Sequence, residues 1–91
     1  MELEEISIER FDEGELVLKE ENKFILSKGA WSTVMYLYRE RQRDGEFGEL
    51  KVRLVRYQKR QGRYMQHSRF NITGVKQVKQ LMEKLTEWFP D

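Results

Sequence analysis

Basic and aromatic residues are interleaved in the second half of the chain. The 31 residues from Leu50 to Gln80 contain no Asp or Glu. Their nine basic residues are Lys51, Arg53, Arg56, Lys59, Arg60, Arg63, Arg69, Lys76 and Lys79. Tyr57, Tyr64 and Phe70 each directly follow an arginine. Because basic groups bind phosphates and aromatic faces stack on unpaired bases, this pattern predicts a surface for a single-stranded nucleic acid.

Residues before this block extend the predicted surface. The expected nucleic-acid-binding set is Lys28, Trp31, Arg39, Arg41, Lys51, Arg53, Arg56, Tyr57, Lys59, Arg60, Arg63, Tyr64 and Arg69. We expect the cations of the middle strands to project together into solvent as one ribbon flanked by exposed rings. Structural roles stay open as alternatives, since Tyr64 and Phe70 would also fill a core and Trp31 would also cap a sheet. Outward-facing cations also protect strands from edge-to-edge aggregation.

The same residue types argue against catalysis. The chain has no cysteine and a single histidine, His67, which excludes thiolate chemistry and conventional Cys- or His-based metal sites. The carboxylates gather in the N-terminal part, away from the basic block, and no phosphate-binding glycine loop is present. We therefore expect no enzyme activity, no metal, no cofactor and no small-molecule substrate.

Charge is distributed unevenly along a chain whose net charge is only +1. Residues 1–22 hold nine acids against Arg10 and Lys19, a local balance of −7. Such asymmetry is typical of chains with nucleic-acid or membrane partners. No segment has the length of a membrane span, and the acidic start differs from a signal peptide, so we expect a cytoplasmic protein without a membrane partner.

The spacing of apolar residues predicts the elements that position these groups. Residues 1–12 alternate weakly and indicate an edge strand or a loose arm. Residues 15–20 and 23–27 are rich in strand-forming types, and form either a hairpin around Glu21 and Asn22 or one bent strand. Further strands are predicted at 33–42, from Glu49 through the alternation of 50–55, and at 63–72, with a loop at Asp44 and Gly45. In the strand from 50 to 55 we expect Leu50, Val52 and Leu54 to point inward and the cations outward.

The last segment changes to a helical period. Its apolar residues are Val75, Val78, Leu81, Met82, Leu85, Trp88 and Phe89. Thr73 is the expected N-cap and Pro90 the stop, which predicts a helix over 73–89. The simplest arrangement lays this helix on its own sheet. Leu81 and Trp88 widen the stripe enough for a second contact with a partner helix.

Together the patterns predict one α+β domain over residues 1–91. It comprises an antiparallel sheet of four to six strands within 15–72 and one C-terminal amphipathic helix. A chain of 91 residues buries a thin core, so we expect it to complete that core as a homodimer.

The order of these elements resembles the transcriptional positive-cofactor-four coactivator family and its bacterial relatives. The likeness covers Trp31–Phe89 and rests on a strand with Leu54, Val55, Arg56 and Tyr57, a turn glycine at Gly62, and Arg69, Ile72, Thr73, Leu81 and Leu85 around the helix start. The resemblance implies a transcription cofactor that binds single-stranded DNA in channels between curved sheets of a dimer. It further implies Lys51, Arg53, Arg56, Lys59, Arg60 and Arg63 on phosphates, with Tyr57, Trp31 and Tyr64 on bases. It places helix residues Val78, Leu81, Met82, Leu85, Trp88 and Phe89 at the dimer interface.

Three functional hypotheses stay open at this point. The first is a sequence-tolerant binder of single-stranded DNA or RNA, with DNA favoured, in which the acidic residues 1–22 compete with the nucleic acid. The second is a protein-interaction module whose basic face meets an acidic partner. The third is a structural homodimer whose charges keep it soluble.

Overall fold

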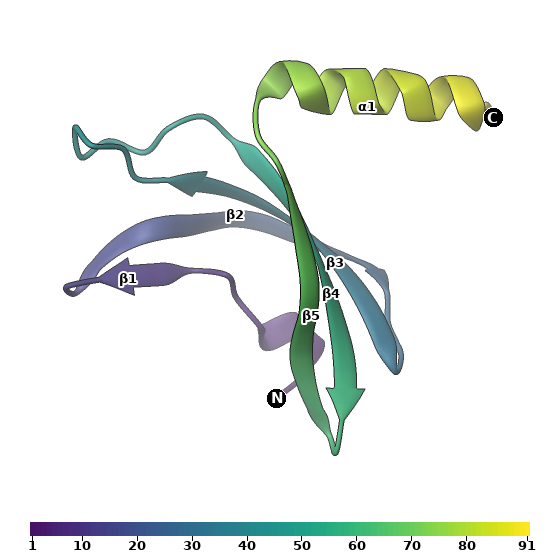
Figure 1. Ribbon diagram of the computed structural model, residues 1–91, viewed down its shortest axis with the longest axis horizontal. Helices are drawn as coiled ribbons and strands as arrows, with labels where there is room; N and C mark the ends of the chain where they lie inside the picture. Colours follow the sequence, from purple (N-terminus) through teal and green to yellow (C-terminus); the bar gives the residue numbers. More distant parts are fainter.

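The chain folds as one antiparallel sheet followed by one helix. A computed structural model describes all 91 residues. After a short 3-10 helix, η1, the strands follow each other in the sheet in chain order, and α1 comes last (Figure 1). The elements are η1 (Leu3–Glu5), β1 (Arg10–Asp12), β2 (Glu15–Ser27), β3 (Trp31–Glu40), β4 (Lys51–Arg60), β5 (Arg63–Ile72) and α1 (Val75–Trp88). The predicted α+β class, with a curved antiparallel sheet and a C-terminal helix, is confirmed.

Two tight turns set the register of the sheet. Glu13 and Gly14 join β1 to β2 with φ values of 51° and 81°. Gln61 and Gly62 join β4 to β5 with φ values of 51° and 77°. Two-residue turns with positive φ at both positions match the twist of antiparallel strands and hold them closely paired. The turn predicted at Gly62 and the strand predicted over 63–72 are thus confirmed.

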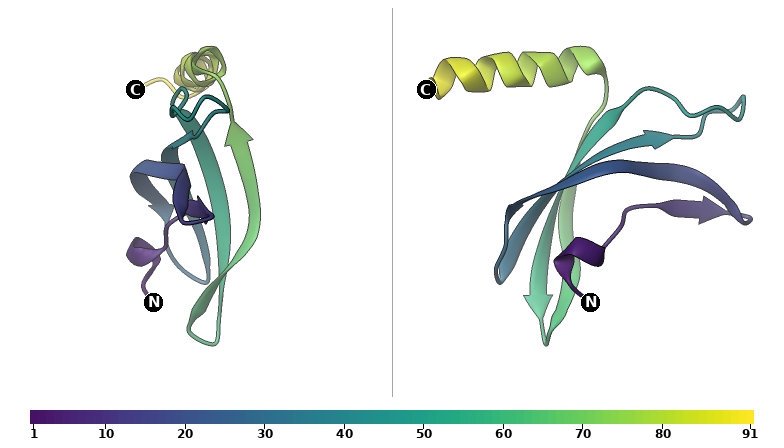
Figure 2. Two further views of the ribbon diagram at one scale, coloured as in Figure 1. Left: turned by 90° about the vertical axis from the view of Figure 1, so that its left-hand side faces the viewer. Right: turned by 180° about the vertical axis from the view of Figure 1, so that it is seen from behind.

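The segment between β1 and β3 is one long strand rather than a hairpin. β2 runs without a break through Glu21 and Asn22, and its pairing with β3 shifts between Glu20 and Asn22 and again between Ile25 and Ser27. The hairpin alternative is therefore wrong, and the bent strand is confirmed. Bulges of this kind bend a strand and increase its twist. They help the sheet curl into a half-barrel, which is seen from two further sides in Figure 2.

The connection between β3 and β4 is longer than expected. β3 ends at Glu40, and β4 begins at Lys51 instead of Glu49. Within this loop, Arg41 and Phe47 form an isolated antiparallel bridge, and Gly45 takes a φ of 91°. The predicted turn at Asp44 and Gly45 is therefore present, but the strands do not continue up to it.

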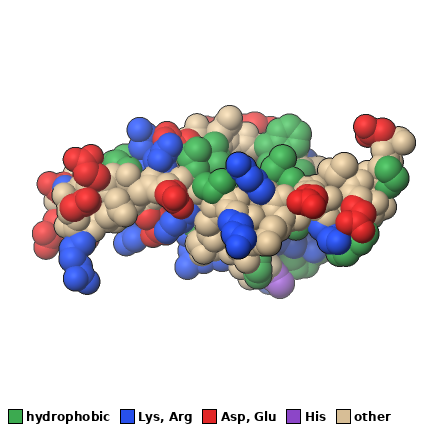
Figure 3. All heavy atoms as spheres, turned by 90° about the horizontal axis from the view of Figure 1, so that it is seen from above, with side chains coloured by type: hydrophobic (Ala, Val, Ile, Leu, Met, Phe, Trp, Pro, Cys, Tyr) green, Lys and Arg blue, Asp and Glu red, His purple; other side chains and the backbone are tan.

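The C-terminal helix does not lie on its own sheet. It extends away beyond the end of β5 (Figure 1), and none of its residues is buried. Hydrophobic side chains, drawn in green, are exposed on the side of the molecule that Figure 3 shows. The N-cap of the helix is Gly74, which has a φ of 105°. No side chain forms a capping hydrogen bond at this end of the helix. The expected Thr73 N-cap and the expected packing on the sheet are both wrong. The glycine redirects the chain at the end of β5, so the helix leaves the sheet instead of turning back over it.

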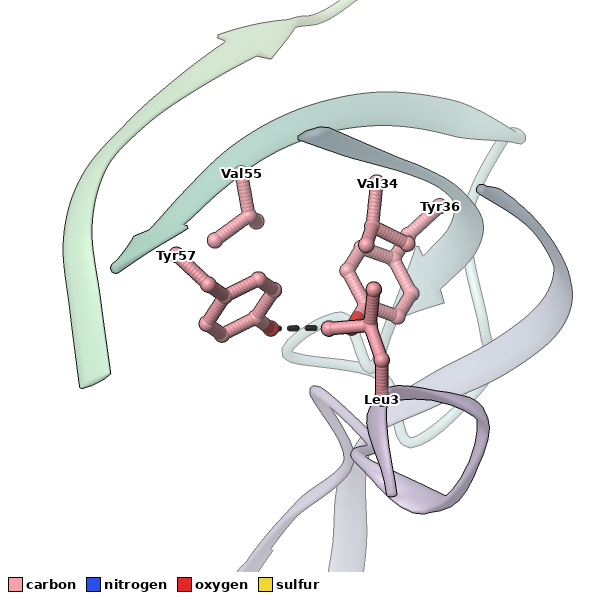
Figure 4. Packing of buried hydrophobic residues seen from close by; sticks show 5 residues of the cluster. All are labelled: Leu3, Val34, Tyr36, Val55 and Tyr57. Atoms are coloured by element: carbon pink, nitrogen blue, oxygen red, sulfur yellow. Dashed lines mark hydrogen bonds between the residues drawn. The ribbon is translucent and has the colours of Figure 1, made fainter. Parts of the chain in front are cut away.

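The two faces of the sheet differ in what covers them. We call the face against which residues 1–9 pack the inner face and the opposite one the outer face. On the inner face Val34, Tyr36, Val55 and Tyr57 are buried together beneath Leu3 (Figure 4). Residues paired directly across antiparallel strands share a face. Every second residue of β4 points to the same side, so Arg53, Val55 and Tyr57 all lie on the inner face.

This arrangement reverses one expectation for β4. Val52 and Leu54 point to the outer face and are only half buried, whereas the core lies on the side that carries Lys51 and Arg53. The prediction that the apolar residues of 50–55 face the core is wrong. The reason is that one side of β4 carries two kinds of residue. Lys51 and Arg53 occupy this side in the first half of the strand, and Val55 and Tyr57 occupy it in the second half.

Candidate nucleic-acid interface

Strand alternation divides the predicted binding residues between the two faces. Lys51, Arg53, Tyr57, Lys59, Tyr64 and Arg69 belong to the inner face. Trp31, Arg39, Arg56, Arg60 and Arg63 belong to the outer face. The expectation of one continuous ribbon of cations is therefore wrong. Arginines spaced by three residues, such as Arg53 and Arg56, must point in opposite directions on one strand.

Several predicted cations are already paired with carboxylates. Lys28 contacts Glu4 at 2.9 Å, Arg39 contacts Glu21 at 3.0 Å, and Lys51 contacts Glu40 at 3.1 Å. Arg41 is paired with Glu15. No carboxylate lies within 4.0 Å of the remaining predicted cations, Arg53, Arg56, Lys59, Arg60, Arg63 and Arg69. Of these, Arg53, Lys59 and Arg69 share the inner face.

An open cavity of about 690 Å³ lies on the inner face between residues 6–10 and strands β4 and β5. The sheet residues that line it are Leu18, Glu40, Arg53, Tyr57, Tyr64, Gln66, Arg69 and Asn71. Glu9 and Arg10 line it from the N-terminal segment, so the cavity holds two carboxylates as well as three arginines. Sequence reasoning missed Gln66 and Asn71. Only their position opposite Tyr57 and Arg53 in the β4–β5 register brings them into the site.

Arg53 is the most unusual group in this cavity. Its residue surface is only 7% exposed, and its guanidinium carbon lies 4.8 Å from the centre of the Tyr38 ring. Its Nε donates a hydrogen bond of 2.6 Å to Oδ1 of Asn71. Burying a cation without an anion is costly, and the planar guanidinium is suited to a phosphate. Arg53 therefore lines the cavity with a planar guanidinium that has no carboxylate within 4.0 Å.

Tyr57 is placed differently from its predicted role on bases. Its ring is buried, and its hydroxyl lies 2.8 Å from that of Tyr36. Burial raises the pKa of Tyr36 well above its usual range, and the hydrogen bond to Tyr57 adds to this. Burial also raises the pKa of Tyr57, against the opposing effect of the hydrogen bond from Tyr36. Tyr57 is therefore a core residue and is not exposed for stacking on a base.

These two tyrosines make the fold sensitive to alkali. Their neutral forms are favoured in the folded state, so their contribution to stability is complete below the ordinary tyrosine pKa of about 10 and is lost as the pH rises above it. We expect the urea midpoint of unfolding to fall between about pH 8 and about pH 11.5. Replacing Tyr36 and Tyr57 by Phe should flatten this dependence. An equally steep loss in that double variant would show that other groups cause it.

Each face of the sheet has one accessible aromatic ring among the predicted binding residues. On the inner face, the half-buried Tyr64 lies beneath Lys59, whose Nζ is 5.3 Å from the ring centre. On the outer face Trp31 is 40% exposed, and the guanidinium carbon of Arg56 lies 5.0 Å from the centre of its ring. The centres of the Trp31 and His67 rings are 4.8 Å apart, with the two rings nearly perpendicular. Both pairs of ring and cation are suited to stacking on a base.

No protein family, curated protein or solved structure matches this chain. The resemblance to the positive-cofactor-four family therefore stays a prediction, and the residues themselves must carry any functional proposal. The helix is too short and too polar to cross a membrane.

Proposed function

We propose that this chain is a sequence-tolerant binder of single-stranded nucleic acid, DNA in preference to RNA, that acts as a homodimer. The buried Arg53, which has no carboxylate partner and faces an open cavity, carries this proposal. Arg69 lines the same cavity, and Lys59 lies farther along the same face of β4. Phosphates would meet these three cations, and Tyr64 would stack on a base. A role as transcription cofactor, which the family resemblance implies, belongs to the same proposal.

The proposed dimer follows from the surface that one copy leaves exposed. The chain has an accessible surface of 7170 Å², about 1,500 Å² more than a compact monomer of its mass would expose. Its radius of gyration is 14.9 Å, against about 12 Å for a compact domain of this length. A stable interface buries about 800 Å² or more per partner, so the excess is sufficient for a large dimer interface.

Two apolar surfaces supply this interface, and neither covers the other within one chain. One is the helix stripe, in which Leu81, Met82, Leu85, Trp88 and Phe89 are exposed. The other is a row across four strands of the outer face, where Phe24 pairs with Met35, Met35 with Leu54, and Leu54 with Phe70. A second copy has both surfaces, so a two-fold dimer would bury each of them.

One observation supports a different function. The inner face already holds an acidic stretch of polypeptide, residues 1–9, through Lys23 and Lys28. A protein-interaction module that binds acidic peptides in this way is the second candidate.

A titration of labelled oligo-dT, followed by fluorescence anisotropy at several salt concentrations, tests the proposal. Three inner-face cations on phosphates should give a slope of log affinity against log salt of about −2 per protomer, at about −0.7 per contact. An unlabelled oligo-glutamate peptide should compete only weakly. Binding that ignores salt would contradict the proposal, and strong competition by the peptide at equal charge would favour the interaction module.

A further inference from the structure

The N-terminal segment covers the middle of the inner face. Leu3 is fully buried, and Figure 4 shows it packed over Val34, Tyr36, Val55 and Tyr57. Ile6 and Ile8 pack against the same cluster. Regular pairing with the sheet begins only at Arg10, so residues 1–9 lie across the inner face outside the strand ladder.

A few side chains of the sheet hold this segment. Nζ of Lys23 donates hydrogen bonds to the carbonyl oxygens of Leu3, Glu4 and Ile6 at 3.3, 2.7 and 2.5 Å. The Glu20 carboxylate accepts hydrogen bonds from the Ser7 hydroxyl at 3.0 Å and from the backbone N–H of Ile8 at 3.3 Å. Lys28 pairs with Glu4 near the start of the segment.

The position of Leu3 interrupts the proposed binding surface. Along β4 the inner-face residues follow in the order Lys51, Arg53, Val55, Tyr57 and Lys59. Leu3 packs on Val55 and Tyr57, and therefore lies between Arg53 on one side and Lys59 on the other. A nucleic acid strand that contacts both cations along the inner face meets Leu3 on its way. The segment also brings Glu9 to the cavity that Arg53 and Arg69 line, and Glu4 to Lys28.

We propose that residues 1–9 form an autoinhibitory strap, and that the floor beneath it, Val34, Tyr36, Val55 and Tyr57, is a further subsite for an unpaired base. This inference rests on the proposed function. When the strap leaves, the Tyr57 ring faces the ligand between Arg53 and Lys59, and Lys23 and Lys28 lose their strap partners and become available to phosphates. The apparent dissociation constant then equals the intrinsic constant divided by the fraction of molecules in which the strap is open.

The first test opens the strap by substitution. In Leu3→Glu a carboxylate replaces the buried side chain, which disfavours the closed state. Affinity for oligo-dT should rise at least about tenfold, equivalent to about 1.4 kcal/mol of strap closure. Phe11→Glu is the matched control, because Phe11 follows the strap in β1 and is 62% exposed, so the substitution adds the same charge without removing the buried Leu3 side chain. Its affinity should stay equal or fall slightly.

The second test closes the strap and does not depend on how Leu3→Glu folds. The chain has no cysteine, so Glu4→Cys with Lys28→Cys provides two unique thiols at an observed contact. A short bis-maleimide linker with a cleavable disulfide should lower affinity for oligo-dT at least about tenfold, and reduction of the linker should restore it. Because the comparison is made within one variant, the loss of Lys28 does not affect it.

The outcomes separate the two proposals. If the unmodified chain binds oligo-dT, and closing the strap leaves that binding unchanged, the strap proposal is wrong and the proposed function stands. If neither the unmodified chain nor Leu3→Glu, shown to be folded by circular dichroism, binds oligo-dT at low salt, the proposed function fails and the strap proposal falls with it.

Discussion

Replacing Arg53 and Arg69 together by glutamine should weaken oligo-dT binding at least about tenfold and make the salt slope shallower by about 1.4. Both side chains line the inner-face cavity, which Glu9 and Glu40 also line, and neither has a carboxylate within 4.0 Å. Each would lose one contact with a phosphate, and a hydrogen bond to a charged group contributes about 1.5–3 kcal/mol. Anisotropy titrations at several salt concentrations measure both the affinity and the slope.

The matched control is the same pair of substitutions on the other face. Arg60 and Arg63 pair with each other on the outer face and also lack a carboxylate partner, so Arg60→Gln with Arg63→Gln removes equal charge. This control should change affinity by less than about threefold, the effect of general charge alone. If both double variants lose affinity equally, the nucleic acid follows net charge and the inner face has no special role. Circular dichroism must confirm that Arg53→Gln remains folded, since Arg53 also bonds Asn71.

Replacing Leu81 and Leu85 by glutamate should convert the proposed dimer to a monomer. These residues lie on the helix stripe and are 41% and 44% exposed in the single chain, so their burial depends on a partner. Two carboxylates in an apolar interface would cost several kcal/mol, enough to lower dimer affinity by more than about a hundredfold. Size-exclusion chromatography with light scattering measures the mass directly.

Lys76→Glu with Gln80→Glu is the control for this helix. Those positions lie opposite the stripe by helical spacing, and their substitution adds at least as much negative charge. The control should keep the dimer mass. If the unmodified chain is monomeric at micromolar concentrations, the dimer proposal is wrong and another molecule must cover the helix.

Local patterns in the sequence were sufficient for most elements of the fold. Alternation identified β4, β-forming residues identified β3 and β5, and the spacing of Val75 to Phe89 identified α1. β2 was harder because of its bulge. Leu18 and Lys23 both face inward although their numbers differ in parity, since Glu21 is an extra residue between the paired Glu20 and Asn22. A strict period of two therefore fails at that point, so the pattern of apolar residues is compatible with two short strands as well as with one bent strand.

The site was less predictable because it depends on which face is covered. Counting cations along 50–80 pointed to β4 and β5, but the side chains of one strand alternate between two faces of the sheet. The deciding contact is Leu3, in a segment with weak alternation and many acids that gave little sign of burial. The helix pattern also does not predict that α1 stands apart from the sheet, since an amphipathic stripe can pack on the sheet of the same chain or on a second copy.

The bulge in β2 has a consequence for the curvature of the inner face. Without Glu21 the neighbours Glu20 and Lys23 would still lie on the side they occupy now, because Glu21 has no partner in the β3 register. The ion pair of Glu21 with Arg39 would be lost. The strand would lose bend and twist, and the inner face would become less curved while keeping the same side chains. A variant that lacks Glu21 would thus keep the same inner-face side chains on a flatter sheet.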